Sequence, residues 1–207
     1  MDIPPPSVPD SQLAGWRQTD RTVDSPFSTP MLSVSTHTYV YEESTQRREI
    51  AARTGLDHPW RFFFLSRVQF TPSQPPNPML TSLLGNRISS AFVDRLSSRG
   101  LTAIEKQAET RISVDGSRGH RKRYRAQFQF DTEELAGSEV GDAEELCLPI
   151  ESYLAIWADD DYHVAGGAYP AGPAESGPAA LVEVLDDVID TAAAREELLA
   201  LIDGCGE

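Results

Sequence analysis

A run of basic side chains over residues 118–125 is the segment of the sequence best suited to chemistry. It reads RGHRKRYR. Alternation along an extended strand places Arg121, Arg123 and Arg125 on one face and Tyr124 on the other. Guanidinium groups pair with carboxylates through two parallel hydrogen bonds, and they also bind phosphates. The candidate partner-binding residues are therefore Arg118, Arg121, Arg123 and Arg125, and a carboxylate of this chain or of a partner is favoured over nucleic acid.

The rest of the sequence contains no recognisable catalytic, cofactor-binding or metal-binding set. The glycine motifs of nucleotide sites and the G-x-S-x-G motif are absent. The acids 159–161 lack the ligand ladder of a calcium loop and are expected to form a solvated turn. The cysteines and histidines are not spaced as metal ligands are. They are Cys147, Cys205, His37, His58, His120 and His163. We expect no enzyme, no cofactor and no metal site, and leave open whether the cysteines pair and whether His37 meets His163.

The charge of the chain is strongly acidic and unevenly distributed. Its 207 residues carry 32 acidic and 18 basic side chains, a net charge of −14, and only two of the basic residues are lysines. Residues 131–207 hold 20 acids against one arginine. Such a surface suits molar salt, where the Debye length falls to about 3 Å and carboxylates hold hydrated cations. We expect a protein of a halophilic cell, with weak non-specific cation binding by its surface carboxylates.

Periodicity and capping predict the elements that position these side chains. Strands are expected over residues 14–23, 32–41, 60–70, 101–106, 110–114, 120–130, 147–157 and 162–169. Helices are expected over 44–52, from Asn77 and Pro78 to Gly100, and over 179–203 with a break near Thr191. The aromatic run 60–64 indicates a central strand buried on both faces rather than a pocket. Short turns between strands favour antiparallel pairing. The predicted fold is α+β, a mostly antiparallel β-sheet flanked by helices.

The N-terminal segment differs in composition from the rest of the chain. Residues 1–12 contain four prolines and are expected to form a disordered lead-in, followed by a single α+β domain over residues 13–207. The segment has neither the basic nor the apolar region of a signal peptide, and Trp16 stands where a lipoprotein would carry its cysteine. No apolar run is long enough for a membrane span. These features predict a cytoplasmic protein.

Four stretches of the sequence together resemble a known family. They are TYVYE at 38–42, WRFFF at 60–64, RGL at 99–101 and the run 157–170, which contains AGGAYP. They are similar to a haloarchaeal family of unknown function that includes lipoprotein-like members, and the likeness covers most of residues 14–203. The order of helices and hairpins is more distantly similar to the PsbP-like α/β/α sandwich. That resemblance implies a binding or assembly module and assigns no catalytic residue.

Two classes of function therefore remain. The first is a non-enzymatic module that binds a protein partner, because the sequence combines well-formed strands with no catalytic set. The alternative is a small-ligand or nucleic-acid binder that uses the basic hairpin 118–125. A deep pocket lined by converging polar groups would favour an enzyme, and a shallow groove would favour a binding surface.

Overall fold

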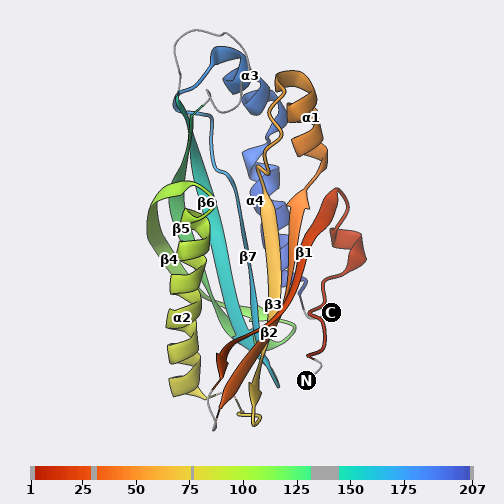
Figure 1. The fold of residues 1–207 in the computed structure, drawn as a ribbon, viewed down its shortest axis with the longest axis vertical. Helices are drawn as coiled ribbons and strands as arrows, with labels where there is room; N and C mark the ends of the chain where they lie inside the picture. The colour runs from red at the N-terminus through yellow and green to blue at the C-terminus, as the bar shows by residue number, and fades with distance from the viewer. Residues whose placement is uncertain (1–2, 29–31, 76, 132–144, 206–207) are drawn as a thin grey trace.

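One antiparallel sheet of seven strands organises the molecule (Figure 1). The computed structural model describes residues 3–28, 32–75, 77–131 and 145–205. The spatial order of the strands is β1-β2-β3-β7-β6-β5-β4, and all neighbouring strands pair antiparallel. Their bounds are β1 Trp16–Ser28, β2 Ser33–Glu43, β3 Phe62–Thr71, β4 Leu101–Val114, β5 Ser117–Asp131, β6 Glu145–Ala158 and β7 Tyr162–Pro170. The α+β prediction is confirmed.

Helices cover both faces of the sheet and one of its ends (Figure 1). Helix α2 lies on one face and α4 on the other, and α1 packs against α3 at the end of the sheet. The bounds are α1 Thr45–Thr54, α2 Pro78–Ser97, α3 Ala179–Val188 and α4 Thr191–Asp203, and a single 3-10 turn spans Asp10–Gln12. None of the helices in the described part of the chain is long and apolar enough to cross a bilayer.

Local sequence explains where the helices begin. The Asn77 side chain accepts a hydrogen bond from the Leu80 amide at 2.9 Å, so α2 starts as its Asn-Pro pair predicts. Asp190 caps α4 in the same way and separates it from α3, which explains the break near Thr191. Helix α1 differs from the prediction, because the carboxylate of Glu43 caps it and the Ser44 side chain does not.

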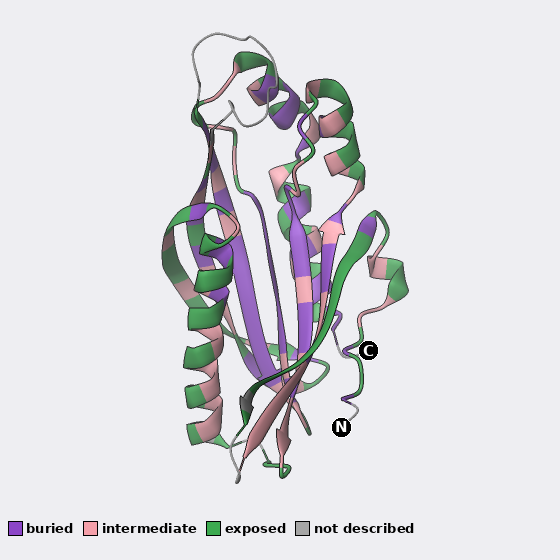
Figure 2. Cartoon of the chain, in the orientation of Figure 1, coloured by how far each residue is buried: buried purple, intermediate pink, exposed green. Residues whose placement is uncertain are grey.

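The apolar residues form one core on each face of the sheet (Figure 2). Strand β3 shows the division, because Phe62 and Val68 belong to the core under α2, whereas Phe63 and Leu65 belong to the core under α4. The expectation of a central strand buried on both faces is confirmed. Figure 2 shows the inner strands buried and the outer strands largely exposed.

One strand differs from the sequence prediction. The segments 101–106 and 110–114 form one strand, β4, which contains two irregularities in its pairing with β5. Within the proline-rich segment 1–12, Ile3 is buried and its carbonyl oxygen is 3.1 Å from Nδ1 of His37. The acidic stretch 131–145 is expected to form a loop. Its ends belong to β5 and β6, and residues 132–144 lie outside the described residues.

Candidate binding groove

The candidate arginines are divided between the two faces of strand β5. Arg121, Arg123 and Arg125 pair across the sheet with Ala155, Tyr153 and Glu151 of β6, on the face that α4 covers. Arg121 makes an ion pair with Asp203 at 3.3 Å, and Arg123 makes one with Glu151 at 3.5 Å. Arg125 is exposed and makes no ion pair with any residue that the structure describes. Two arginines of this row therefore contact acids of the C-terminal segment.

Glu151 is the centre of a polar cluster beneath α4. Its carboxylate accepts hydrogen bonds from the hydroxyls of Tyr153 at 2.8 Å and Tyr169 at 2.5 Å. Arg123 and Arg195 lie at 3.5 and 3.8 Å from the same carboxylate. Burial and the adjacent carboxylate raise the pKa of the Tyr169 hydroxyl well above its usual range. Both tyrosine hydroxyls and both arginines lie around one carboxylate, so this cluster stabilises the fold, although Nε of Arg123 is buried without a hydrogen bond in the described residues.

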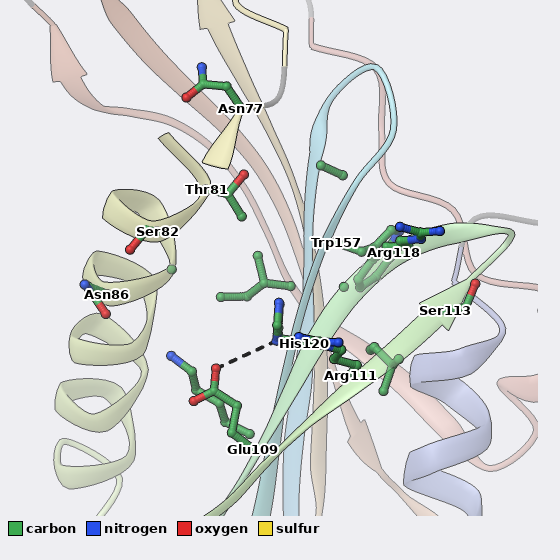
Figure 3. Close-up of a pocket in the computed structure, with 16 residues that line it drawn as sticks. Asn77, Thr81, Ser82, Asn86, Glu109, Arg111, Ser113, Arg118, His120 and Trp157 are labelled. Carbon is green, nitrogen blue, oxygen red and sulfur yellow. Dashed lines mark ion pairs between the residues drawn. The ribbon is translucent and has the colours of Figure 1, made fainter. Parts of the chain in front are cut away.

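Arg118 lies on the opposite face of the hairpin and contributes to a groove (Figure 3). This binding groove has a volume of about 1400 Å³ and is open to solvent between α2 and the β4–β5 hairpin. The hairpin is closed by the two-residue turn Asp115-Gly116, in which both residues have positive φ, as a tight turn requires. From the strands, the polar side chains that line the groove are Glu109, Arg111, Ser113, Arg118, His120 and Lys122.

The groove carries an excess of positive charge. Glu109 is its one acid among the described residues, against Arg111, Arg118 and Lys122. Burial raises the pKa of Glu109, but the Lys106 hydrogen bond and the neighbouring positive charges outweigh it, so the carboxyl stays ionised. Lys122 donates to the Ser89 hydroxyl at 2.7 Å.

Two arginines of the binding groove have no charged partner. Neither Arg111 nor Arg118 makes an ion pair with a residue in the described part of the chain, and both are exposed. His120, next to them, has Nδ1 3.9 Å from Glu109. The strand side of the groove thus offers two guanidinium groups to a ligand with negative charge.

Helix α2 supplies the opposite wall of the groove with neutral polar groups. Asn77, Thr81, Ser82 and Asn86 line the groove on this side, and Figure 3 shows Thr81 on the side of the helix nearer the strands. Thr81 shares a hydrogen bond with the Tyr162 hydroxyl at 3.1 Å, while the side chains of Ser82 and Asn86 make no hydrogen bond with a described residue. Amide and hydroxyl groups opposite guanidinium groups can bind the backbone and the carboxylates of an extended chain.

The sequence prediction missed most of this groove. Arg118 is the one groove residue that it named as a candidate. The wall of the groove that α2 supplies could have been predicted from the sequence, because residues 77, 81, 82 and 86 recur at helical spacing. They form a polar stripe beside the apolar stripe of the helix. Arg111 carried no local signal, since only the pairing of β4 with β5 brings it beside His120.

The histidines and cysteines stay apart in the structure. His37 and His163 lie in one row of the sheet, but Arg67 of β3 stands between them. His163 Nε2 is 3.1 Å from Asp159, and His37 contacts the N-terminal segment. The two cysteines are free, and burial raises the pKa of the Cys205 thiol to about 12. The described residues contain no group of three potential metal ligands.

Comparison with known proteins yields a family and no characterised relative. The family model that matches is described as a domain of unknown function, DUF6517, and it spans residues 5–206. The chain matches no curated protein and no solved structure. The function must therefore be argued from the geometry of the chain itself.

Proposed function

The chain belongs to the DUF6517 family of unknown function, and from its geometry we propose that it is a protein-binding module that receives an acidic segment of a partner in the binding groove. The observation that carries this proposal is the pair Arg111 and Arg118, two exposed guanidinium groups without a charged partner in the described residues. The protein has a net charge of −14, so an arginine on its surface would be expected to pair with a carboxylate of the same chain.

The shape of the groove supports a chain-like ligand rather than an enclosed substrate. It is long and open, with a charged wall from the hairpin and a neutral polar wall from α2. Two of the most exposed large apolar side chains, Met79 and Leu83, lie on α2 next to the polar stripe, where they can contact a partner outside the groove. A polar centre with apolar contacts beside it is a composition found in protein interfaces.

Carboxylates are favoured over phosphates as the charge that the groove receives. Affinity for nucleic acid comes mainly from counterion release and falls steeply with salt. Paired hydrogen bonds between guanidinium and carboxylate are directional and keep more of their strength when salt screens simple charge attraction. In the halophilic, cytoplasmic setting that the composition favours, an acidic protein segment is thus the better ligand, and the alternative of nucleic acid on hairpin 118–125 becomes an outcome of the test.

The proposal is tested by titrating a fluorescently labelled hexaglutamate peptide with the protein and measuring the fluorescence polarisation of the peptide. The Arg111→Gln/Arg118→Gln double variant should bind the peptide at least tenfold more weakly, since each charged hydrogen bond contributes about 1.5–3 kcal/mol. The matched control is Arg125→Gln, which removes an exposed charge from the other face of β5 and should leave affinity within about twofold. Circular dichroism should show both proteins folded, because none of the three arginines makes an ion pair in the described structure.

Two results would contradict the proposal. One is hexaglutamate binding that is absent, or equally strong in the double variant. The other is a labelled hexanucleotide that binds more tightly than the peptide at both low and molar KCl and loses its affinity in the double variant.

A further inference from the structure

A second, smaller cavity lies at the other end of α2 and shares no lining residue with the binding groove. This aromatic pocket has a volume of about 140 Å³. The loop before β3, the residues after α2 and the centre of the sheet surround it, with His58, Trp60, Phe62, Arg99 and Phe128 among its walls. It therefore combines segments that are far apart in the sequence.

Four aromatic rings, those of His58, Trp60, Phe62 and Phe128, form part of the wall of this pocket. The His58 ring lies 4.7 Å from the Phe128 ring and 5.1 Å from the Trp60 ring, measured between centroids. Trp60 and Phe128 are 6.4 Å apart and meet edge to face. The sequence predicted core positions for the run 60–64, and Trp60 and Phe62 are indeed buried, but they also border this space. An apolar cavity of about 150 Å³ is large enough for a benzene ring.

Two polar groups at the pocket have no partner among the residues that the structure describes. Trp60 is only 6% exposed, and its Nε1 atom is buried without a hydrogen bond. The Arg99 guanidinium stacks over the Phe62 ring at 4.3 Å and makes no ion pair with a described residue. A donor that lacks an acceptor destabilises the protein. Nε1 of Trp60 is covered by protein atoms, so Arg99, which is only partly buried, is the group that can reach a ligand in the pocket.

The charge at the pocket is that of Arg99. No acid lines the pocket, and burial together with Arg47 and Arg99 lowers the pKa of His58 to about 4, so its ring is neutral at neutral pH. Glu42 is a carboxylate whose charge acts on Arg99, but its own Oε2 lies 2.6 Å from Nη1 of Arg47. Arg99 is therefore left without a nearby counterion of its own.

We propose that the aromatic pocket binds a small apolar carboxylate about the size of benzoate. The ring of the ligand lies among His58, Trp60 and Phe128, and its carboxylate accepts hydrogen bonds from the guanidinium group of Arg99. The volume limits the ligand to a single ring or a short branched chain. This inference does not depend on the function proposed for the binding groove.

The experiment titrates the full chain with benzoate and follows the tryptophan indole signals by NMR. The Trp60 signal, assigned with Trp60→Phe, should shift and saturate with a Kd of about 1 mM, a normal affinity for a ligand this small. The indole of Trp16 serves as the internal reference, since it already donates to Glu197 and lines neither the aromatic pocket nor the binding groove. Benzyl alcohol, which keeps the ring and removes the charge, should bind at least tenfold more weakly.

Substitution of Arg99 tests the charge directly. Arg99→Gln should weaken benzoate binding at least tenfold and leave benzyl alcohol within about twofold. The matched control is Arg95→Gln, which removes an exposed charge one helical turn away and should leave benzoate binding within about twofold. Thermal melts report whether each variant is folded.

Three results would overturn the assignment. A Trp60 signal that does not respond to benzoate at about 20 mM, a concentration well above the expected Kd, means that the pocket is closed to ligands. Equal affinity for benzoate and benzyl alcohol means an apolar cavity without carboxylate recognition. Equal benzoate affinity in folded Arg99→Gln and wild type removes Arg99 as the recognition group.

Discussion

Arginine side chains have three distinct roles in this protein, and the position in the fold decides which one applies. Arg61 is 4% exposed and pairs with Glu197 at 2.5 Å, so it joins β3 to α4. Arg123 contacts Glu151 beneath the same helix. Arg111 and Arg118 face the binding groove without a charged partner in the described chain. Unlike Arg61 and Arg123, Arg111 and Arg118 can offer their full hydrogen-bonding capacity to another molecule.

The stability of the protein should depend on pH through His58. Its pKa falls from 6.5 to about 4 on folding because burial disfavours the charged ring. Between pH 4 and pH 6.5 the unfolded chain binds more protons than the folded one. The stability that depends on a neutral His58 is therefore fully present above about pH 6.5 and is lost as the pH falls toward 4. We expect the free energy of unfolding to lose about 2 kcal/mol through His58 between pH 7 and pH 4.5.

Urea titrations of wild type and His58→Phe at both pH values measure this loss. Carboxylates titrate in both proteins, so the difference between the two pH dependences isolates His58. The variant should lose about 2 kcal/mol less than wild type over this range. An identical loss in the two proteins would show that the imidazole is charged and solvated in the folded state.

At the scale of elements, the glycines of β7 let the layers of the fold approach closely. A Cβ atom added at Gly166 would lie 2.5 Å from the Tyr153 carbonyl oxygen of the neighbouring strand. One added at Gly167 would meet the Phe62 carbonyl oxygen, and it would lie 2.7 Å from Cδ1 of Leu198 in α4. The absence of a side chain at this pair lets α4 pack closely, since β7 is the strand against which α4 packs.

Alanine at Gly167 should therefore be destabilising. The clash is with backbone and with a buried leucine, neither of which can move freely, so we expect a loss of about 1–3 kcal/mol in the free energy of unfolding. The matched control is Gly85→Ala, because a Cβ there meets nothing within 4 Å and lies in the middle of α2. That change should stabilise the protein by about 0.5–1 kcal/mol. Equal stability of Gly167→Ala and wild type in urea titrations would refute this account of the packing.

At the scale of the whole molecule, the fold brings opposite charges of the sequence together without neutralising the protein. Residues 87–130 have a net charge of +6 and residues 131–207 one of −19. The pairing of β5 with β6 sets Arg125 opposite Glu151, and Arg121 reaches Asp203 of α4. The 32 acids still outnumber the 18 basic residues, so the net charge of −14 repels itself across the surface.

Salt should therefore stabilise the protein strongly. The Debye length shrinks from about 10 Å at 0.1 M to about 3 Å at 1 M, which screens the repulsion between exposed carboxylates. We expect the melting temperature to rise by about 10 °C between 0.1 and 2 M KCl, equivalent to about 3 kcal/mol for a chain of this length. Sorbitol at the same osmolality controls for effects of water activity. A melting temperature that is independent of KCl would refute the assignment of the acidic surface to a salt-rich environment.

The sequence alone determined the elements whose signals are local. The Asn77-Pro78 pair predicts where α2 begins, the alternation over 121–130 predicts the two faces of β5, and the run 60–64 predicts a buried strand. Each of these signals depends on neighbours within a few residues, because capping and side-chain alternation are properties of a short stretch of backbone.

Tertiary structure alone decided which of these elements meet. Strand β3 pairs with β7 across roughly a hundred residues, α2 lies beside the β4–β5 hairpin, and the N-terminal segment docks on His37. These neighbours are selected by how well whole apolar faces pack, a free energy summed over the entire chain that no single stretch encodes. Both the binding groove and the aromatic pocket form between such elements, so their residues could not be grouped until the sheet order was known.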